Sequence, residues 1–169
     1  MSKGDIMPFD NAQSGKMGGA LKYKVTANSN GASGSQGNIF PGEPVQKLAG
    51  AAGVTALLTN SPTTTNRIVG VAASQSNETA SVDGTVDVIP ATTQDIWLIA
   101  PKVAATWNTQ ANYNAQVGKR VLIDNTAGVY TILAADGASN GCIVEWLDVA
   151  RYPGMVAFSF SPLCDYRNV

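Results

Sequence analysis

Histidine is absent from the 169 residues of this chain. Without an imidazole, the chain lacks Ser-His-Asp and Cys-His catalysis, histidine-ligated metals and histidine-based pH switching. Charge is also scarce, because Asp, Glu, Lys and Arg make up 14% of the residues and the formal net charge is -1. The sequence therefore has no basic field that would collect phosphate groups, and no run of Lys or Arg typical of membrane binding. We expect neither nucleic acid nor membrane as a partner.

Cysteines and long apolar runs are few as well. Cys142 and Cys164 could pair, but two buried thiols are the interpretation that fits synthesis in a reducing cytoplasm. No apolar run follows residues 1–5, and nowhere do about eighteen apolar residues stand together. We therefore expect neither a signal peptide nor a membrane-spanning helix.

What the sequence has in abundance is small and turn-forming residues, including 17 Gly and 8 Pro. This composition is typical of an all-β protein with short strands. Four strands joined by turns are predicted near the C-terminus as a β-meander, at residues 117–124, 129–133, 142–148 and 155–161. In the last of them Val156, Phe158 and Phe160 alternate with smaller residues, which indicates a sheet with one buried face. That face needs a partner sheet, so we predict a β-barrel or β-sandwich of short antiparallel strands.

The earlier chain supplies further predicted strands, at residues 20–26, 45–48, 54–58, 67–73 and 95–100. Asp83 and Gly84 predict a two-residue hairpin between residues 79–82 and 85–89. For residues 102–116 two structures remain possible. One is a helical turn, and the other is a loop that contacts the meander through Trp107 and Tyr113. We divide the chain into an extended irregular arm (1–42), a first β half (43–101), a connecting segment (102–116), and the meander with its tail (117–169).

Candidate catalytic groups are few. The carboxylates of Asp124, Asp136, Glu145 and Asp148 lie in or beside the meander, but nothing in the sequence indicates the cleft and the raised pKa of a glycosidase pair. No D-x-D-x-D-G loop is present for a hard cation. The string Ser14-Gly15-Lys16 lacks the hydroxyl residue after the lysine that a phosphate-binding loop needs. We therefore predict a protein that is no enzyme and has neither cofactor nor metal.

Three tryptophans, Trp97, Trp107 and Trp146, lie in or near predicted strands, where core packing is the usual role. Glu145 is expected to be a solvated carboxylate that points away from the buried face. What remains is a chain of short strands with glycine-rich loops and a long irregular N-terminal portion. Such a chain suits assembly on another protein through backbone pairing and small apolar anchors.

Several segments are similar to one family of virion proteins. Residues 69–72 (VGVA) and 82–91 (VDGTVDVIPA), then 112–124 (NYNAQVGKRVLID) and 128–133 (GVYTIL), resemble the capsid decoration, or cement, proteins of tailed bacteriophages. The resemblance covers about residues 65–160. It implies a β-barrel or β-sandwich, often a homotrimer, that binds the major capsid protein on the outside of the virion at junctions between capsomers. It carries over no catalytic residue.

Our leading hypothesis is therefore a structural protein of the capsid exterior, made in the host cytoplasm. In it the arm and its apolar residues Phe9, Ile39 and Phe40 contact the capsid or neighbouring subunits. Two alternatives stay open. One is a structural component of a phage tail, neck or fibre, and the other is a carbohydrate-binding module that uses Trp97, Trp107 or Trp146.

Overall fold

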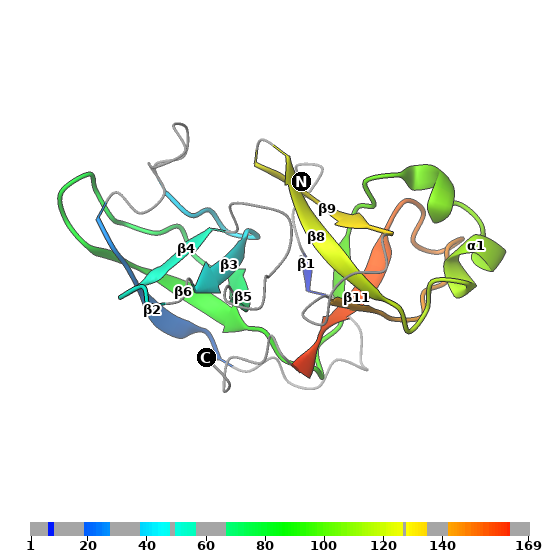
Figure 1. The fold of residues 1–169 in the computed structure, drawn as a ribbon, viewed down its shortest axis with the longest axis horizontal. Coiled ribbons are helices and arrows are strands. Elements are labelled where there is room, and N and C mark those ends of the chain that lie inside the picture. The colour runs from blue at the N-terminus through cyan, green and yellow to red at the C-terminus, as the bar shows by residue number, and fades with distance from the viewer. Residues whose placement is uncertain are drawn as a thin grey trace.

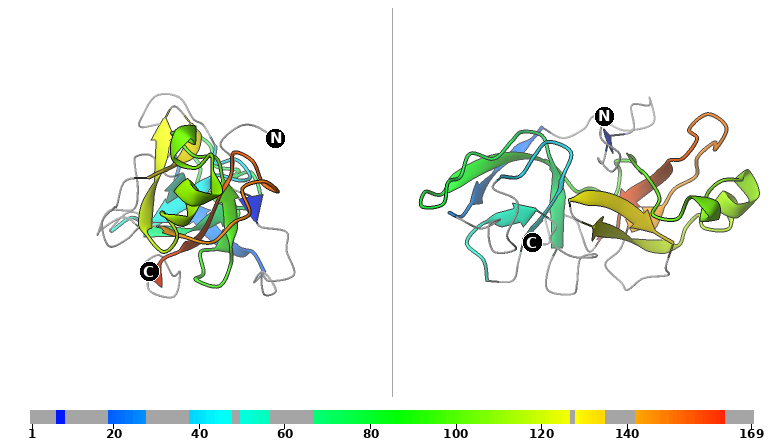
Figure 2. Two further views of the ribbon diagram at one scale, coloured as in Figure 1. Left: turned by 90° about the vertical axis from the view of Figure 1, so that its right-hand side faces the viewer. Right: turned by 90° about the horizontal axis from the view of Figure 1, so that it is seen from above.

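The computed structural model describes residues 7–8, 19–27, 38–47, 50–56, 67–126, 128–134 and 142–162. Its architecture is all-β, as predicted from composition and alternation. Two curled antiparallel sheets lie side by side along the long axis of the molecule (Figures 1 and 2). Among the described residues, no helix is long and apolar enough to cross a membrane.

The first sheet is formed by the N-terminal part of the chain and has five strands. Their order is β2 (Leu21–Val25), β6 (Gly84–Pro90), β5 (Arg67–Ala72), β3 (Pro44–Lys47) and β4 (Val54–Ala56). It curls until its two edges approach, because Gly53 brings the chain before β4 onto β2. A Cβ at Gly53 would lie 2.6 Å from the carbonyl oxygen of Lys24. The valines and alanines of these strands fill the core inside the curl.

The second sheet has six strands. Their order is β1 (Met7–Pro8), β7 (Trp97–Ile99), β11 (Val156–Phe160), β10 (Cys142–Val144), β8 (Arg120–Thr126) and β9 (Val129–Leu133). The predicted meander is wrong in its order, because β10 pairs with β8 and not with β9. Residues 134–141 separate β9 from β10, and this length does not force the two strands to be neighbours.

The second sheet also curls until its ends meet. Directly after β7, Pro101 forms a parallel bridge with Ile132 of β9. The N–H of Lys102 donates to the carbonyl of Ile132 at 2.9 Å, and the N–H of Ile132 donates to the carbonyl of Ala100 at 3.0 Å. The outer edge of β9 is thus occupied by the chain's own backbone, which removes an open edge that could pair with other chains.

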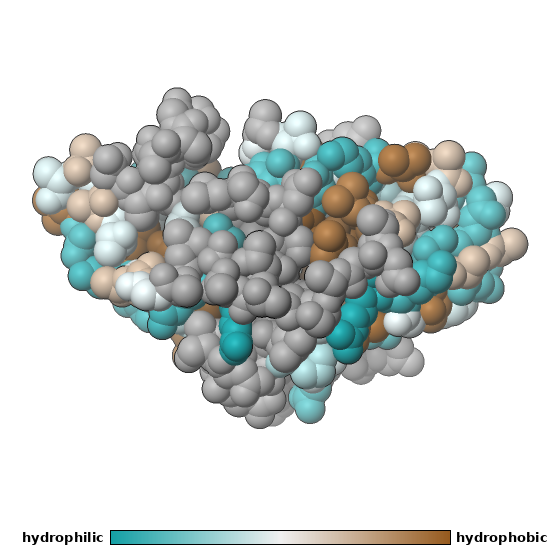
Figure 3. Space-filling view, in the orientation of Figure 1, coloured by the Kyte–Doolittle hydropathy of each residue, from teal (hydrophilic) through white to brown (hydrophobic). Residues whose placement is uncertain are grey.

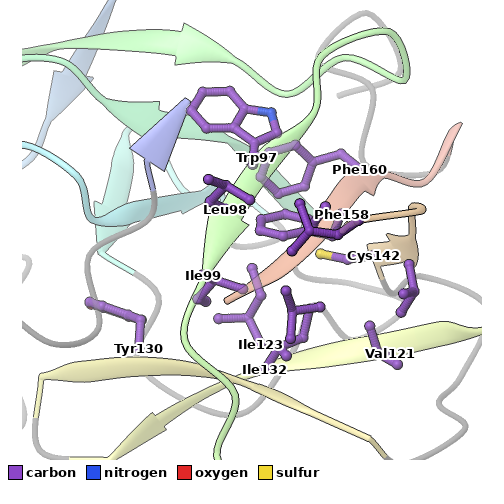
Figure 4. Close-up of a cluster of buried hydrophobic side chains, with 14 of the residues drawn as sticks. Trp97, Leu98, Ile99, Val121, Ile123, Tyr130, Ile132, Cys142, Phe158 and Phe160 are labelled. Atoms are coloured by element: carbon purple, nitrogen blue, oxygen red, sulfur yellow. The ribbon is translucent and has the colours of Figure 1, made fainter. Parts of the chain in front are cut away.

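Aromatic residues fill the core of the second sheet (Figure 4). Phe160 makes edge-to-face contacts with Trp97 and Phe158, at ring-centroid distances of 5.8 and 5.3 Å. Such contacts add about 0.5–1.5 kcal/mol to the burial of the rings. Cys142 lies in this core as a buried thiol, as interpreted from the sequence, whereas Cys164 lies outside the described residues. The prediction that the last strand buries one face is wrong, because β11 is buried along its whole length and both of its faces are covered.

The two sheets are joined by a shared core. Ile68 and Val71 of β5, together with Ala91 after β6, belong to the same buried cluster as the aromatic residues of the second sheet. The earlier chain thus contributes packing partners to the C-terminal strands, as predicted, although each sheet curls mainly around its own interior. Burial of one aliphatic side chain contributes roughly 1.5–3 kcal/mol, so these contacts hold the two sheets together.

The predicted hairpin at Asp83 and Gly84 is wrong. Residues 79–82 form no strand, and Gly84 instead begins β6, which pairs with β2 and β5 inside the first sheet. A Cβ on Gly84 would overlap the backbone nitrogen of Glu78. The Asp83 carboxylate is 2.6 Å from Lys24 Nζ and accepts the Ala27 N–H, so the pKa of Asp83 is lowered. This Asp-Gly pair therefore does not form a type I′ turn. Gly84 lets the backbone of Glu78 pack closely, and Asp83 bonds to neighbouring groups.

An ion pair between the buried Asp124 and the partly exposed Lys102 lies where the second sheet closes. The carboxylate of Asp124 is 2% exposed, and its Oδ2 lies 2.7 Å from the Nζ of Lys102 and accepts a 2.8 Å hydrogen bond from the hydroxyl of Thr126. Burial raises the pKa of Asp124, but the hydrogen bonds from Lys102 and Thr126 outweigh it, and the net effect is a lowered pKa. Asp124 is thus a structural carboxylate.

We expect this ion pair to appear in the pH dependence of stability. Because the folded state lowers the pKa of Asp124, its contribution is present above the unfolded value of about 3.9 and is lost as the pH falls through the folded value. Asp124→Asn should lower stability by roughly 1 kcal/mol at neutral pH, since Lys102 is partly exposed. Urea titrations between pH 2 and 7 should show this difference shrinking below about pH 4. A constant difference across that range would contradict the assignment.

Candidate binding surfaces

The first candidate surface contains the residues predicted as anchors. Phe9 lies outside the described residues. Ile39 is 0% exposed in the core of the first sheet, and its N–H donates to the Ser76 hydroxyl at 2.7 Å. The prediction of Ile39 as a contact residue is therefore corrected, because an external partner cannot reach a core side chain. Phe40 is 43% exposed and available.

A tight turn holds Phe40 outward. The Glu43 N–H donates to the Phe40 carbonyl at 3.1 Å, and the Phe40 N–H donates to the Glu43 carboxylate at 3.0 Å. Pro41 and Gly42 occupy the central positions, and the φ of 90° at Gly42 is the value that a type II turn needs. Ala72 of β5 holds the second half of this turn, because its carbonyl accepts the N–H of Gly42 and its N–H donates to the carbonyl of Glu43. The Phe40 ring thus projects from a turn that hydrogen bonds hold in place. The preceding residue, Ile39, is buried in the core of the first sheet.

The second candidate surface is a groove of about 670 Å³ at the far end of the second sheet. One wall is formed by a 3₁₀ turn (Ala104–Thr106), the helix α1 (Gln110–Asn114) and the residues around them (Figure 1). The opposite wall is the loop between β10 and β11, which contributes Asp148, Val149 and Pro153. Its volume is in the range of small-molecule sites, which are mostly apolar with a few polar groups.

Gln110 ties the two walls together. Its Nε2 donates to the carbonyl of Leu147 at 3.0 Å, and its Oε1 accepts the N–H of Val149 at 3.1 Å. The side-chain oxygen of Thr109 accepts the N–H of Asn112 and so caps α1. The helix was one of two open possibilities for this segment, and the cap compensates for the asparagines that disfavour it.

Tyr113 fixes α1 to the sheet. Its hydroxyl donates to the carbonyl of Glu145 at 3.0 Å and accepts the N–H of Ala157 in β11 at 2.8 Å. Burial raises the pKa of Tyr113 to about 12, with a further increase from the charge of Glu145, while the hydrogen bond from Ala157 lowers it. The ring packs edge-to-face on Trp107 at 5.5 Å. Tyr113 thus contacts the C-terminal part of the chain and Trp107 packs on Tyr113, but Tyr113 does so from a helix and not from the loop for which this contact was predicted.

The three tryptophans do not share one role. Trp97 and Trp107 are 0% and 2% exposed, as expected for core residues, but Trp146 is 63% exposed, and its prediction as a core residue is wrong. β10 ends at Val144, so the alternation that would bury Trp146 no longer applies. Both neighbours of Trp146 are fixed, because the Glu145 N–H donates to the Ala157 carbonyl and Leu147 accepts from Gln110. The exposed indole therefore stands on a rigid backbone.

The predicted carboxylates are engaged in local structure. Glu145 is not the outward solvated group expected, since it is half-buried and accepts a 2.6 Å hydrogen bond from the hydroxyl of Ser159. Asp148 accepts the N–H groups of Ala150 and Arg151. Asp136 lies outside the described residues. In the part of the chain that the structure describes, no three His, Cys, Asp or Glu side chains gather as metal ligands would.

Further apolar residues reach the surface over β8 and β9 (Figure 3). There Leu122 and Leu133 are opposite each other across the two strands and are half-buried, and Val129 is 43% exposed. They lie on the outer face because their neighbours in sequence point into the core. Exposed apolar surface is thus not confined to the Phe40 turn and the groove.

No family model matches this chain, and neither the curated proteins nor the solved structures contain a match. The function proposed below therefore rests on the sequence and the geometry of this chain.

Proposed function

We propose that this chain is a structural protein of a tailed-bacteriophage virion, which binds the major capsid protein on the outside of the shell and stabilises contacts between capsomers. The observation that carries the proposal is the exposed Phe40, held by a rigid turn at the position where the sequence predicts an anchor. The resemblance of residues 65–160 to decoration proteins and the all-β architecture support it.

A rigid aromatic side chain is a favourable contact residue. Aromatic residues are enriched among the few interface positions that carry most of the binding energy, and pre-organisation reduces the entropy lost on association. One such residue contributes too little for stable attachment. A homotrimer, which the resemblance implies, would present three copies to the shell, and linked weak contacts add up to a stable attachment.

The test of this function is binding to bare capsids of the cognate major capsid protein. Phe40→Ser should weaken binding at least about tenfold, which corresponds to roughly 1.4 kcal/mol, with little change in stability because the side chain is partly exposed. Co-sedimentation over a range of protein concentrations measures the affinity, and light scattering measures the oligomeric state of the free protein.

The matched control is Val82→Ser. Val82 is an exposed apolar residue in the loop before β6 of the first sheet, 61% accessible, and its removal should leave capsid binding unchanged. Saturable binding in fixed proportion to capsid subunits, lost in the Phe40 variant alone, is the expected result. A wild-type protein that does not sediment with capsids, or equal losses in both variants, would overturn the proposal.

A further inference from the structure

We propose that the edge of β7 is a strand-docking site between copies of this chain, in which the N-terminal strand β1 of one copy pairs with β7 of the next. This goes beyond attachment to a capsid, because it links copies of the chain to one another. In the single chain, the same edge is occupied by the chain's own β1, with Met7 opposite Leu98 and Pro8 opposite Trp97 in antiparallel register. The occupant is therefore a segment that the structure shows in place.

The edge of β7 is a fixed acceptor that the second sheet leaves partly open. One side of β7 pairs with β11 along all three of its residues, and all three are buried. On the other side, β9 bonds only to the chain that follows β7, at Ala100, Pro101 and Lys102. The backbone of Trp97 and Leu98 is left for β1 on this side. Without a strand there, it would be an open edge of the kind that pairs with other chains.

The strand that fills this edge is weakly held. β1 has two residues, and Pro8 has no N–H to donate. Met7 is thus the one residue of β1 that can donate a backbone hydrogen bond to β7. Terminal segments with few hydrogen bonds open at a low free energy in folded proteins. We therefore expect β1 to leave β7 while the rest of the second sheet stays intact.

The acceptor and the strand lie far apart in the chain. β1 is at its start, whereas β11, which pairs with the inner side of β7, ends at Phe160. The acceptor is therefore complete only when nearly the whole chain has folded, and pairing β1 with it closes a long loop at an entropic cost. Where copies are concentrated in an assembly, the β1 of a neighbouring copy competes with the chain's own.

Exchange between copies needs no new contact, because the pairing is the same whichever copy supplies β1. Residues 9–18 join β1 to the next described residue, and ten residues span at most about 35 Å when extended. Both views of Figure 2 place β1 at the rim of the described chain, where a second copy can reach it. Exchange of an identical element is a low-cost route to oligomers, and reciprocal exchange provides two links for each pair of copies.

The experiment is cross-linking between two variants of the full-length chain, Met7→Cys and Leu98→Cys, both with Cys164→Ser to remove one native thiol. Residues directly opposite in an antiparallel pair have Cα atoms about 4.5–5.5 Å apart, within the range of a disulfide. The variants, one of them with an affinity tag, are mixed under reducing conditions and then oxidised. Met7→Cys mixed with Val103→Cys is the matched control, since Val103 is 56% exposed but lies outside β7. The mixed disulfide should exceed this control at least about tenfold, because docking raises the effective concentration of the two thiols.

The double variant Met7→Cys/Leu98→Cys distinguishes the two sources of the strand. A disulfide within one chain, with no mixed disulfide above the control, would show that β1 stays on its own chain and would overturn the inference. The absence of any disulfide in either experiment would do the same, because β1 would then not occupy this edge.

Met7→Pro provides a second measurement, because it removes the remaining N–H of β1 and leaves β7 unchanged. Light scattering should show smaller oligomers for Met7→Pro than for the wild type and for Val82→Ser. Equal sizes in all three proteins would contradict the inference. Neither measurement uses capsids, so both results are independent of the proposed function, and a protein that exchanges β1 without binding capsids would overturn that function alone.

Discussion

Replacing Gly70 with alanine should remove much of the stability of the first sheet. Gly70 lies in β5, opposite Val45 of β3 on one side and Pro90 of β6 on the other. A Cβ at this position would overlap the carbonyl oxygen of Ile89 and lie 2.6 Å from Val88 Cγ1. Because β6 is an interior strand, its backbone cannot retreat without breaking a ladder on its other side.

Overpacking typically costs about 1–3 kcal/mol where side chains can move aside. Here a backbone group must move, so we expect the free energy of unfolding to fall by about 3 kcal/mol or more. Urea unfolding of Gly70→Ala measures this loss. The control is Gly19→Ala, because an added Cβ at Gly19 meets no atom within 4 Å. Similar unfolding midpoints for the two variants would show that β5 and β6 separate at little cost, against this expectation.

The strands themselves were largely predictable from the sequence. β5 was predicted as a strand at residues 67–73, and five of its six residues are buried. β7 was predicted as a strand within residues 95–100, and it lies between β1 and β11 with all three of its residues buried. In both cases the apolar side chains that identify the strand in the sequence are the ones that it buries. A local pattern is therefore sufficient to predict the strand.

The pairing of the strands was not predictable to the same extent. Asp83 and Gly84 are the strongest local signal for a hairpin, yet Gly84 is needed because the backbone of Glu78 lies against it. A sequence shows that a position requires glycine, but it does not show whether a turn or a neighbouring segment is the reason. The strand order of the predicted meander was wrong for a similar reason, because the length of residues 134–141 does not determine which strand pairs with β10.

The sequence predicted residues of one candidate surface but did not predict the groove. Phe40 and Ile39 were both predicted as contact residues from their place before the turn residues Pro41 and Gly42. The structure exposes Phe40 and buries Ile39, a difference that the local sequence does not show. The groove was missed because its walls come from residues 101–110 and 148–154, which no local pattern connects. Gln110 joins these walls through side-chain hydrogen bonds to the backbone, a type of contact that leaves no periodic signal.

The second large effect is expected at Tyr113, which attaches the groove to the sheet. Tyr113→Ala should cost about 3–5 kcal/mol, the usual range for deleting a buried aromatic ring. Tyr113→Phe keeps the ring and removes only the hydroxyl, which leaves the buried N–H of Ala157 without its acceptor. An unsatisfied buried group costs about 1–3 kcal/mol, so the phenylalanine variant should fall between the wild type and Tyr113→Ala.

The pH dependence distinguishes the hydroxyl from the ring. Because folding raises the pKa of Tyr113 to about 12, its contribution is fully present below the unfolded value of about 10 and is lost as the pH rises through the folded value. Wild-type stability should therefore fall between about pH 10 and 12, and less so in Tyr113→Phe. Burial also raises the pKa of Tyr130, so part of the alkaline loss should persist in the variant.

Exchange of the Ala157 amide gives a local readout of the same contact. In Tyr113→Phe this amide should exchange faster, while amides of the first sheet keep their protection, because the lost acceptor lies between α1 and β11. Val82→Ser, in the loop before β6 of the first sheet, should leave the Ala157 amide unchanged. Unaltered exchange at Ala157 together with wild-type stability in Tyr113→Phe would mean that ring packing alone holds α1, and that the walls of the groove do not depend on this hydroxyl.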